Sequence, residues 1–329
     1  MPGITGMGGG PTGLGLVGGG ALFSVNSWGA RGFSMGSFWE SGSTQTWDHI
    51  DYIDIANDGG GTDFGNLTRD KAQRGGSVSN EARIAQPGGY YRSGGNSTAT
   101  QPIDYVNPAS TGNASDFGDL LATASGPSSH GCDGRGVIAS SNSDNVIQYI
   151  TIETTGNATD FGDRTITCNS SATGGNGVVV VWMGGHNGGY GNTTIDYVTG
   201  ATTGNASDFG DLTLGRDSHS GASSDLNGSD RMLAFHGIAG GNHNDTIDYV
   251  TMSTTGNATD FGNGTASYTS NGGASNNSRG IIMGGGTGGY TTAYNYIRKV
   301  TIDTTGNASN MSTLQTGRRN TSGSSGAAS

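Results

Sequence analysis

Short runs of apolar residues, each bounded by glycine or another small residue, recur along this chain. Clear examples are Val178–Gly185, Met232–Gly241 and Gly280–Gly285. Runs of this length are typical of buried strands, because a strand spans about four to eight residues and a helix usually more. The stretches between them are rich in Gly, Ser, Thr and Asn, which favour turns. The pattern predicts an all-β chain of many short strands.

A recurring phrase follows these apolar runs: Ile-Asp-Tyr, then Thr-Gly-Asn-Ala, then Asp-Phe-Gly. It is clearest between Ile195 and Gly210. Its phenylalanines are Phe64, Phe117, Phe161, Phe209 and Phe261, and a sixth, weaker copy has Met311 in that place. The copies follow one another at intervals of about 49 residues, and self-similarity at such a period indicates a repeat architecture.

The tyrosine of each copy precedes the phenylalanine by the same distance. These tyrosines are Tyr52, Tyr105, Tyr149, Tyr197 and Tyr249, each 12 positions before its phenylalanine, and Lys299 precedes Met311 by 12 as well. A constant length indicates a rigid β-hairpin, in which we expect both aromatic residues to be structural anchors. Gly-Asn pairs such as Gly156-Asn157 and Gly204-Asn205 are predicted to form its two-residue turn, because both residues tolerate positive φ.

Two further strands complete each repeat. The apolar run supplies one, and a Ser- and Ala-rich segment before it, such as Ala274–Ser278, supplies the other. An arginine lies five positions before the small residues that end the apolar run in four copies, at Arg31, Arg83, Arg135 and Arg279. Four strands in each of six repeats predict a six-bladed β-propeller over residues 22–329. Either Thr321–Ser329 or Ser24–Ser27 could complete the first blade.

The order of a strand ending in Gly-Gly, then Asp-Tyr, then an aromatic residue 12 positions later resembles the Kelch repeat. Phenylalanine stands where Kelch repeats usually have tryptophan, so the likeness is to a divergent branch. The wording Thr-Ile-Asp-Tyr-Val-Thr with Thr-Gly-Asn-Ala-Thr-Asp-Phe-Gly is similar to Kelch-like virion proteins of marine cyanophages and related tailed phages. The resemblance covers roughly residues 31–320 and implies a Kelch-like propeller in a virion.

Composition excludes several classes of protein. Of 329 residues, 64 are glycine and 12% are charged, with a net charge of −11. No basic groove for nucleic acid is expected, and the one basic pair, Arg318-Arg319, is predicted on an exposed turn. No apolar run is long enough for a membrane span, and no signal peptide is expected.

Two repeated or paired features are predicted to be structural. Cys132 and Cys168 are too few for a disulfide framework and are expected to be free thiols. The Asn-x-Ser/Thr sequons at Asn157, Asn205 and Asn257 fall at one position of the repeat, so we interpret them as part of a turn and not as glycosylation sites.

Residues 1–21 form a Gly-rich arm with no hydrophobic period, such as Gly8-Gly9-Gly10 and Gly18-Gly19-Gly20. A free arm of this composition would be disordered. We expect a neighbouring subunit in an assembly to hold it, and packing on its own propeller is the alternative. Other virion proteins are therefore the expected partners, and a homo-oligomer is left open.

The loop between the second and third strands varies most. The distance from the small residue that ends the apolar run to the tyrosine of Ile-Asp-Tyr is 17 residues from Gly88 to Tyr105 but 9 from Gly240 to Tyr249. Loops that vary on a constant scaffold are typical binding regions. The candidate ligand-binding residues on them, for a host-surface glycan or protein, are Trp39, Trp47, Tyr90, Tyr91, His186, Tyr190, His243 and Tyr290.

Catalytic and metal chemistry finds little support in the sequence. Asp-Phe-Gly recurs as a structural repeat without a phosphate-binding loop, and no histidines stand at metal-ligand spacing. His236 and His243, on one repeat, are predicted as surface or strand residues. The repeated pairs Asp196 with Asp208 and Asp248 with Asp260 supply too few oxygens for calcium, so we expect them to cap turns. No catalytic residue, metal or cofactor is expected.

These observations favour a non-enzymatic phage structural protein, located in the virion as a tail, fibre or capsid-decoration component. We expect the variable-loop face to contribute to host recognition. The alternative is a free carbohydrate-binding or adhesin propeller. Aromatic residues among Asn, Ser and Gly suit either role, because they offer contact area at low entropic cost.

Overall fold

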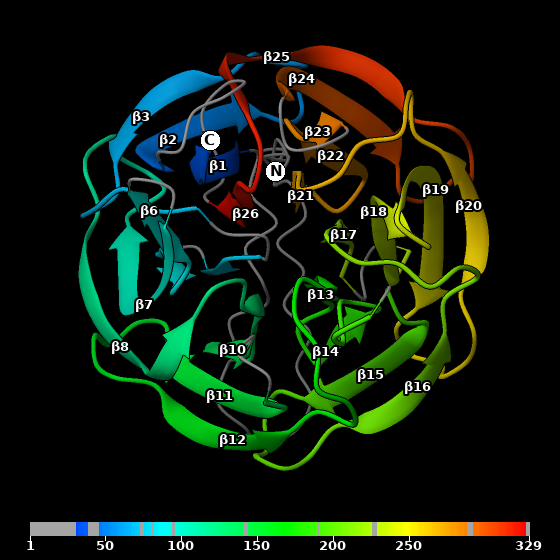
Figure 1. Cartoon of the computed structure of the whole chain (residues 1–329), viewed down its shortest axis with the longest axis horizontal. Helices are drawn as coiled ribbons and strands as arrows, with labels where there is room; N and C mark the ends of the chain where they lie inside the picture. Colours follow the sequence, from blue (N-terminus) through cyan, green and yellow to red (C-terminus); the bar gives the residue numbers. More distant parts are fainter. Residues whose placement is uncertain are drawn as a thin grey trace, which may run out of the picture.

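The computed structural model describes residues 31–326, apart from 39–45, 73–75, 81, 94–95, 141–143, 190, 226–228 and 288–291. Every regular element among the described residues is a β-strand, and the strands form six antiparallel sheets arranged as a ring (Figure 1). The chain is a six-bladed β-propeller, which confirms the predicted all-β fold. No helix of the described part is long and apolar enough to cross a membrane. The arm, residues 1–21, and Ser24–Ser27 lie outside the described residues.

Each blade has four main strands, which follow one another from the central axis outward. Blade 1 contains β26 (Ser322–Gly326), β1 (Arg31–Phe38), β2 (Thr46–Asp54) and β3 (Thr62–Asn66). Blade 2 contains β4 (Val78–Ser79), β5 (Ile84–Pro87), β7 (Asn96–Val106) and β8 (Ser115–Ala124), with the extra β6 (Tyr90–Ser93). Blade 3 contains β9 (Ser128–Cys132), β10 (Arg135–Ala139), β11 (Val146–Thr151) and β12 (Thr159–Asp163).

The second half of the ring repeats this order. Blade 4 contains β13 (Ala172–Gly175), β14 (Val179–Met183), β15 (Thr194–Thr199) and β16 (Ser207–Asp211). Blade 5 contains β17 (Ser220–Ser223), β18 (Arg231–Ala239), β19 (Asn242–Thr251) and β20 (Thr259–Asn263). Blade 6 contains β21 (Gly272–Ser275), β22 (Arg279–Met283), β24 (Thr292–Thr301) and β25 (Ser309–Arg318), with the extra β23 (Gly286–Thr287).

The C-terminal strand closes the ring. β26 pairs antiparallel with β1, from Arg31 opposite Gly326 to Met35 opposite Ser322. Of the two closures that the sequence leaves open, the structure therefore uses the C-terminal one. Because the innermost strand of blade 1 comes from the far end of the chain, ring closure couples the two ends of the described part.

The aromatic residues of the repeat are anchors, as predicted. All five phenylalanines are buried, each at a β-bulge in the outermost strand; Phe161, for example, is the extra residue between two paired positions of β12. Each meets the tyrosine of its own hairpin edge-on, with ring centroids 5.6–6.2 Å apart. Met311 is half-buried against the blade 6 core.

An arginine at the start of the second strand covers the outer side of most tyrosines. Arg31, Arg83, Arg135 and Arg231 lie 4.4–4.8 Å from the ring centroids of Tyr52, Tyr105, Tyr149 and Tyr249. Each also donates to a backbone carbonyl of the following blade, as Arg135 Nη1 does to Gly200 at 3.1 Å. Arg279, the fourth arginine of the sequence pattern, donates to the Ile55 and Ala56 carbonyls of blade 1, so all four arginines of that pattern join neighbouring blades, and Arg231 does the same.

The predicted Gly-Asn hairpin turn is wrong. In blade 3 the chain reverses earlier, where the Thr154 amide donates to the Thr151 carbonyl at 3.1 Å. Gly156 and Asn157 come after this turn and lie on β8, the outermost strand of blade 2. The constant length of 12 residues therefore reflects a contact between blades as well as a hairpin within one.

We call residues 152–158 and their equivalents the strap segments. In blade 3 the Gly156 and Ala158 amides donate to the Phe117 and Asp119 carbonyls at 2.8 Å, and Asn157 Oδ1 accepts from the Asp119 amide at 3.0 Å. The same three bonds recur at four other junctions. The sequon asparagines thus have the expected structural role, although in a strap and not in a turn.

The glycine after each phenylalanine permits this close approach. A Cβ atom on Gly162 would lie 2.4 Å from the Gly204 carbonyl oxygen of the next strap segment, and Gly162 has a φ of 150°. Gly65, Gly118, Gly210 and Gly262 are in the same situation, with φ of 144–150°. Asp-Phe-Gly therefore combines a core anchor with a gap for the neighbouring backbone.

In blade 5, the residue at which the chain turns after the second strand differs from the predicted one. Gly36, Gly88, Gly184 and Gly284 hold this position in four blades with φ of 55–66°, and His236 holds it in blade 5 with φ of 56°. Gly240 and Gly241 instead form the tip of a β-hairpin that extends β18 and β19. The loop of blade 5 therefore begins at His236 and not at Gly240, because a histidine occupies the glycine position.

We predict that Gly162→Ala destabilises the protein by about 2–4 kcal/mol, because the new Cβ would push away the strap segment of blade 4 and would strain the backbone. Chemical denaturation measures the effect. Gly204→Ala, in the same junction but with open space at its Cβ position, is the control and should change the free energy of unfolding by less than about 0.5 kcal/mol. Equal effects of the two substitutions would contradict the role given to Gly162.

Candidate functional site

The loops between second and third strands and the connectors between blades share one end of the ring, which we call the variable-loop face. Four of these loops continue as β-hairpins, with pairing that extends to Phe38–Thr46, Ser93–Asn96, Ala239–Asn242 and Thr287–Thr292. The strap segments lie at the opposite end. Hairpins of different length on a constant ring are typical of a binding face, so a site is expected here.

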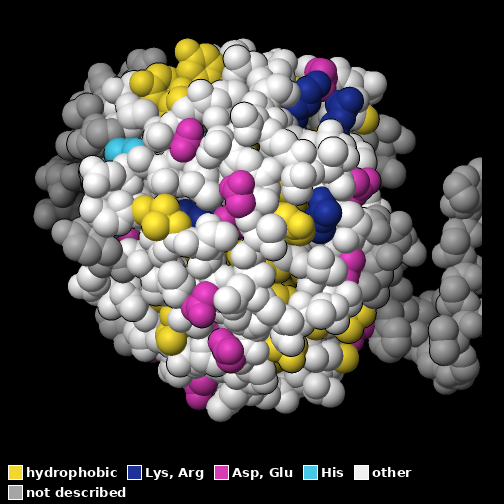
Figure 2. Space-filling view, turned by 90° about the vertical axis from the view of Figure 1, so that its right-hand side faces the viewer, with side chains coloured by type: hydrophobic (Ala, Val, Ile, Leu, Met, Phe, Trp, Pro, Cys, Tyr) yellow, Lys and Arg dark blue, Asp and Glu magenta, His cyan; other side chains and the backbone are white. Residues whose placement is uncertain are grey.

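The side wall of the ring is less promising. Figure 2 shows the wall on the right of Figure 1, around β19 and β20, with acidic side chains spread over it and hydrophobic ones in small separate groups. A docking surface usually has a larger continuous apolar patch.

The structure separates the predicted ligand-binding residues. Trp39, Tyr190 and Tyr290 lie outside the described residues. Tyr90 is only 8% exposed and packs on Ala72, so it belongs to the core of blade 2. Tyr91 on the same strand is 42% exposed. Trp47, His186 and His243 are half-buried and belong to blades 1, 4 and 5.

Two neighbouring blades carry aromatic pairs at equivalent positions of the third strand. In blade 1, Trp47 and His49 meet edge-on with centroids 4.8 Å apart. In blade 6, Tyr294 and Tyr296 are stacked at 5.6 Å and 17°. The other blades have polar or aliphatic residues in these places, namely Thr100 and Pro102, Asp144 and Val146, Asn192 and Thr194, and Asn244 and Thr246. We call the two pairs the aromatic sector.

Beneath these positions, a buried ion pair joins the connector to the following blade at four junctions. The pairs are Arg318–Asp51 (2.8 Å), Lys71–Asp104 (3.0 Å), Arg164–Asp196 (2.7 Å) and Arg216–Asp248 (2.8 Å). The aspartate is the middle residue of the Ile-Asp-Tyr position in each case. Asp196 and Asp248 also accept from the backbone amides of Thr165 and Thr213 in the bend of the connector, so they cap it as predicted in addition to pairing with a cation. Arg318 and Arg319 are buried, not on an exposed turn. Burial lowers the pKa of Lys71, although Asp104 opposes the shift.

The other two junctions replace both members of the pair. In blade 3, Gln148 takes the aspartate position, accepts from the Leu121 amide at 2.8 Å and donates to Ser140 Oγ at 2.9 Å. In blade 6, Arg298 takes the aspartate position and Tyr268 the position of the connector cation. The Arg298 guanidinium lies 3.8 Å from the Tyr268 centroid. A cation–π contact thus stands where other junctions have an ion pair.

Tyrosines extend this contact to the surface in blade 6. Tyr268 meets Tyr294 edge-on at 5.1 Å, Tyr294 stacks on Tyr296, and Tyr296 is 43% exposed. Arg298 also lies 5.1 Å from the Tyr296 centroid. The series therefore runs from a buried arginine to an exposed ring, which can stack on a ligand.

His236 lies below this series. It is fully buried, its ring centroid is 6.3 Å from that of Tyr268, and its Nδ1 is 3.1 Å from Asn271 Nδ2. Burial, followed by the nearby Arg298 and Arg216 charges, lowers the pKa of His236 to about 3. It is therefore neutral at pH 7. His236 lies in β18, as one of the two predicted positions, a surface or a strand, requires, but its complete burial was not predicted.

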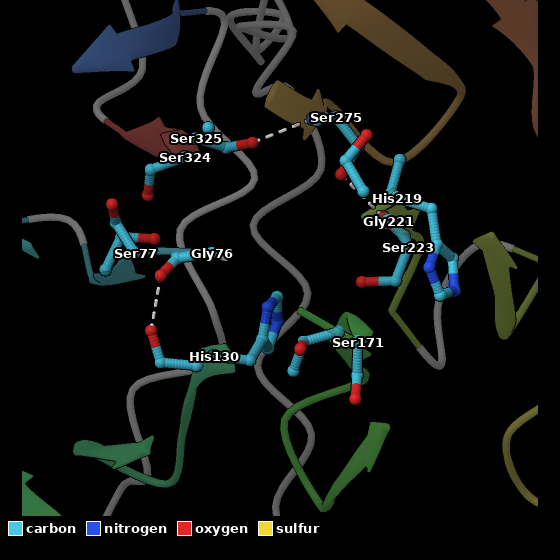
Figure 3. A pocket seen from close by; sticks show the side chains of 17 residues that line it. Gly76, Ser77, His130, Ser171, His219, Gly221, Ser223, Ser275, Ser324 and Ser325 are labelled. Carbon is cyan, nitrogen blue, oxygen red and sulfur yellow. Dashed lines mark hydrogen bonds between the residues drawn. The ribbon is translucent and has the colours of Figure 1, made fainter. Parts of the chain in front are cut away.

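The central channel is narrow and polar. It has a volume of about 50 Å³ and is lined by serines of the innermost strands with His130 and His219 (Figure 3). Roughly 300–1,000 Å³ is typical of small-molecule pockets, so this channel has room for a few water molecules only. Burial lowers the pKa of His130 to about 4, so this side chain is also neutral at pH 7.

Serine hydroxyls in the channel join the innermost strands. Ser325 Oγ accepts from the Ser275 amide (Figure 3), Ser275 Oγ donates to the Ser223 carbonyl, and Ser223 Oγ donates to the Gly175 carbonyl. Ser128 Oγ continues the series by donating to the Ser171 carbonyl at 3.2 Å. These bonds give the channel lining a structural role, so the aromatic sector is the better candidate for a ligand site.

Comparison with known proteins leaves the family open. No protein-family model matches the chain, and no curated protein matches its sequence.

The blade 6 part of the aromatic sector was not predicted, although the sequence contains a pattern that indicates it. Tyr294, Tyr296 and Arg298 alternate at a period of two, which places them on one side of a strand. Alignment of the blades on the Ile-Asp-Tyr motif is needed to show that Trp47 and His49 of blade 1 occupy the same positions as Tyr294 and Tyr296. Tyr268 is far away in sequence, and its contact with Arg298 needed the tertiary structure.

We predict that His236 makes the protein labile in acid. Its pKa is lower in the folded chain than the usual 6.5 of the unfolded chain, so the folded state binds fewer protons. The contribution of its neutral form to stability is complete above pH 6.5 and is lost as the pH falls toward 3. At pH 5 the loss should be on the order of 2 kcal/mol.

His236→Asn tests this, because asparagine tolerates the positive φ and does not titrate. Thermal unfolding from pH 7 to pH 4 should show a shallower loss of stability in the variant than in the wild type. Parallel pH profiles would contradict the prediction.

Proposed function

We propose that the protein is a non-enzymatic structural component of a phage particle, and that its variable-loop face contacts the host surface. The phage context rests on the resemblance of the repeat wording to Kelch-like virion proteins. The contact role rests on the aromatic sector, in which Tyr296 is 43% exposed.

One observation supports this role above others: the two ends of the ring differ in regularity. The strap segments make the same three hydrogen bonds at five junctions. On the variable-loop face, by contrast, loops differ in length between blades, and aromatic pairs occur only in blades 1 and 6 among the described residues. One end is suited to hold the scaffold together, and the other to present residues to a partner.

Attachment to the particle is assigned to residues 1–21. Their glycine content gives the arm little tendency to fold by itself, which favours ordering by other virion proteins. In this arrangement the ring presents its variable-loop face outward in the virion.

A free carbohydrate-binding or adhesin module is the second candidate. It is favoured by the same aromatic sector, since stacked tyrosines suit sugars as well as protein surfaces. The two candidates differ in where the protein is found, because a virion component accompanies purified particles at a constant ratio.

Quantitative mass spectrometry of purified particles should find the protein at a fixed ratio to the major capsid protein. Deletion of residues 1–21 should leave the ring folded, with unchanged thermal unfolding, but should prevent incorporation, because the arm and not the ring makes the attachment. Incorporation of the truncated chain would overturn the role of the arm. Absence of the intact chain from particles, together with glycan binding by the soluble monomer, would favour the second candidate.

The recognition role has its own test. The purified full chain should compete with particles for adsorption to host cells. A variant carrying both Trp47→Ala and Tyr296→Ala should compete at least about tenfold less well, because two stacking rings are lost. Val178→Ser is the control, since Val178 is 49% exposed at the strap end. Equal competition by the two variants would contradict a contact through the variable-loop face.

A further inference from the structure

Arg298 is a buried cation without a carboxylate partner among the described residues. It is 1% exposed, and none of the six ion pairs of the described chain includes it. It donates to neutral oxygens: Nε to Thr265 Oγ1 at 2.8 Å and Nη1 to the Gly284 carbonyl at 3.5 Å. The equivalent residue in four blades is an aspartate that neutralises a connector cation. Blade 6 therefore has a net positive charge where those blades have none.

This charge lies directly beneath an exposed aromatic surface. The guanidinium lies 3.8 Å from the Tyr268 centroid and 5.1 Å from the Tyr296 centroid. Tyr268 with Arg298 suffices to join the connector to blade 6, since a single pair does so at the other junctions. Tyr294 and Tyr296 add a stacked platform, and the Tyr294 hydroxyl lies 3.4 Å from Thr287 Oγ1. The platform thus combines an exposed ring, hydroxyl groups and an uncompensated cation.

Blade 1 provides an internal comparison. Its aromatic pair lies above the neutral Asp51–Arg318 pair and close to two further acids, Asp48 and Asp70. Burial and the Asp48 charge raise the pKa of Asp70, so the surroundings of this pair are unfavourable for negative charge. The two halves of the aromatic sector therefore differ in electrostatic potential, and an anionic group is favoured only on blade 6.

We propose that the Tyr294–Tyr296 platform above Arg298 selects sugars that carry a carboxylate. The sugar ring stacks on Tyr296, and its carboxylate is attracted by the guanidinium. At a separation of roughly 8 Å and an effective dielectric constant of about 40, this attraction corresponds to a preference of about fivefold over the neutral sugar. The proposal rests on the recognition role of the variable-loop face and specifies its ligand as an acidic glycan.

The test uses polymers that differ only in this charge. Binding of the full chain to immobilised polygalacturonate is compared with binding to the fully methyl-esterified polymer, and hyaluronan and polysialic acid are compared with their methyl esters in the same way. At least one acid form should bind about fivefold or more tightly than its ester. Added salt should reduce this difference, because ions screen the attraction.

Variants locate the binding. Tyr296→Ala should weaken binding of the acid polymer about tenfold, whereas Tyr296→Phe should retain it because the ring is kept. Tyr91→Ala is the matched control: Tyr91 is equally exposed, at 42%, but belongs to blade 2. Arg298→Gln should abolish the preference for acid over ester. Should this variant fail to fold, the polymer comparison and the Tyr296 variants still decide.

Each of the other outcomes contradicts one part of the proposal. Equal binding of acid and ester forms, or no binding of any acid polymer, refutes acid selection, and the recognition role survives if the full chain still competes for host adsorption. An equal loss in Tyr91→Ala and Tyr296→Ala refutes the location on blade 6. Failure both to bind polymers and to compete for adsorption refutes the proposed recognition role as well.

Discussion

The ring depends on the contact between adjacent blades at the rim, where the strap segment of one blade lies on the outermost strand of the preceding blade. The outer edge of a four-stranded sheet exposes unpaired backbone groups, which favour aggregation unless they are covered. The strap segment covers this edge with two backbone hydrogen bonds and one asparagine side chain. It can approach so closely only because glycine follows each phenylalanine. The repeated motif, Thr-Gly-Asn-Ala followed by Asp-Phe-Gly, therefore specifies a contact between neighbouring blades more than a turn within one blade.

Two further kinds of contact support the junctions closer to the axis. Serine hydroxyls join several of the innermost strands around the channel, and between them and the rim a connector residue meets the middle residue of the Ile-Asp-Tyr position. Across the six blades both members of this second contact change together, from aspartate with a cation, to glutamine with a backbone amide, to arginine with tyrosine. A buried charge left without its partner would be costly, so one member cannot change alone without a functional reason. Blade 6 has a buried cation without an anion at this position, and the exposed ring of Tyr296 lies close to it.

The closing junction shows how departures from the repeat are compensated. Blade 1 has Gly60 where the other strap segments have asparagine, and a single strap bond remains, from the Gly61 amide to the Thr313 carbonyl. Asp58 compensates by pairing with Arg279 and Lys299 of blade 6. Lys299 stands where the other copies have tyrosine, so the residue that makes the sixth copy hard to recognise contributes to closing the ring.

The sequence by itself determined the strand content, the number of blades and the buried aromatic anchors. These follow from local spacing, and a hairpin of constant length keeps its side chains on fixed sides wherever it occurs. It also identified the face with variable loops, and Trp47 on it. The tertiary structure alone decided which segment closes the ring, that Gly-Asn contacts the preceding blade, and that Tyr268 and Arg298 meet beneath Tyr296. Each of these joins residues of different blades or opposite ends of the chain, and no periodicity within one repeat specifies which neighbour a side chain meets across a junction.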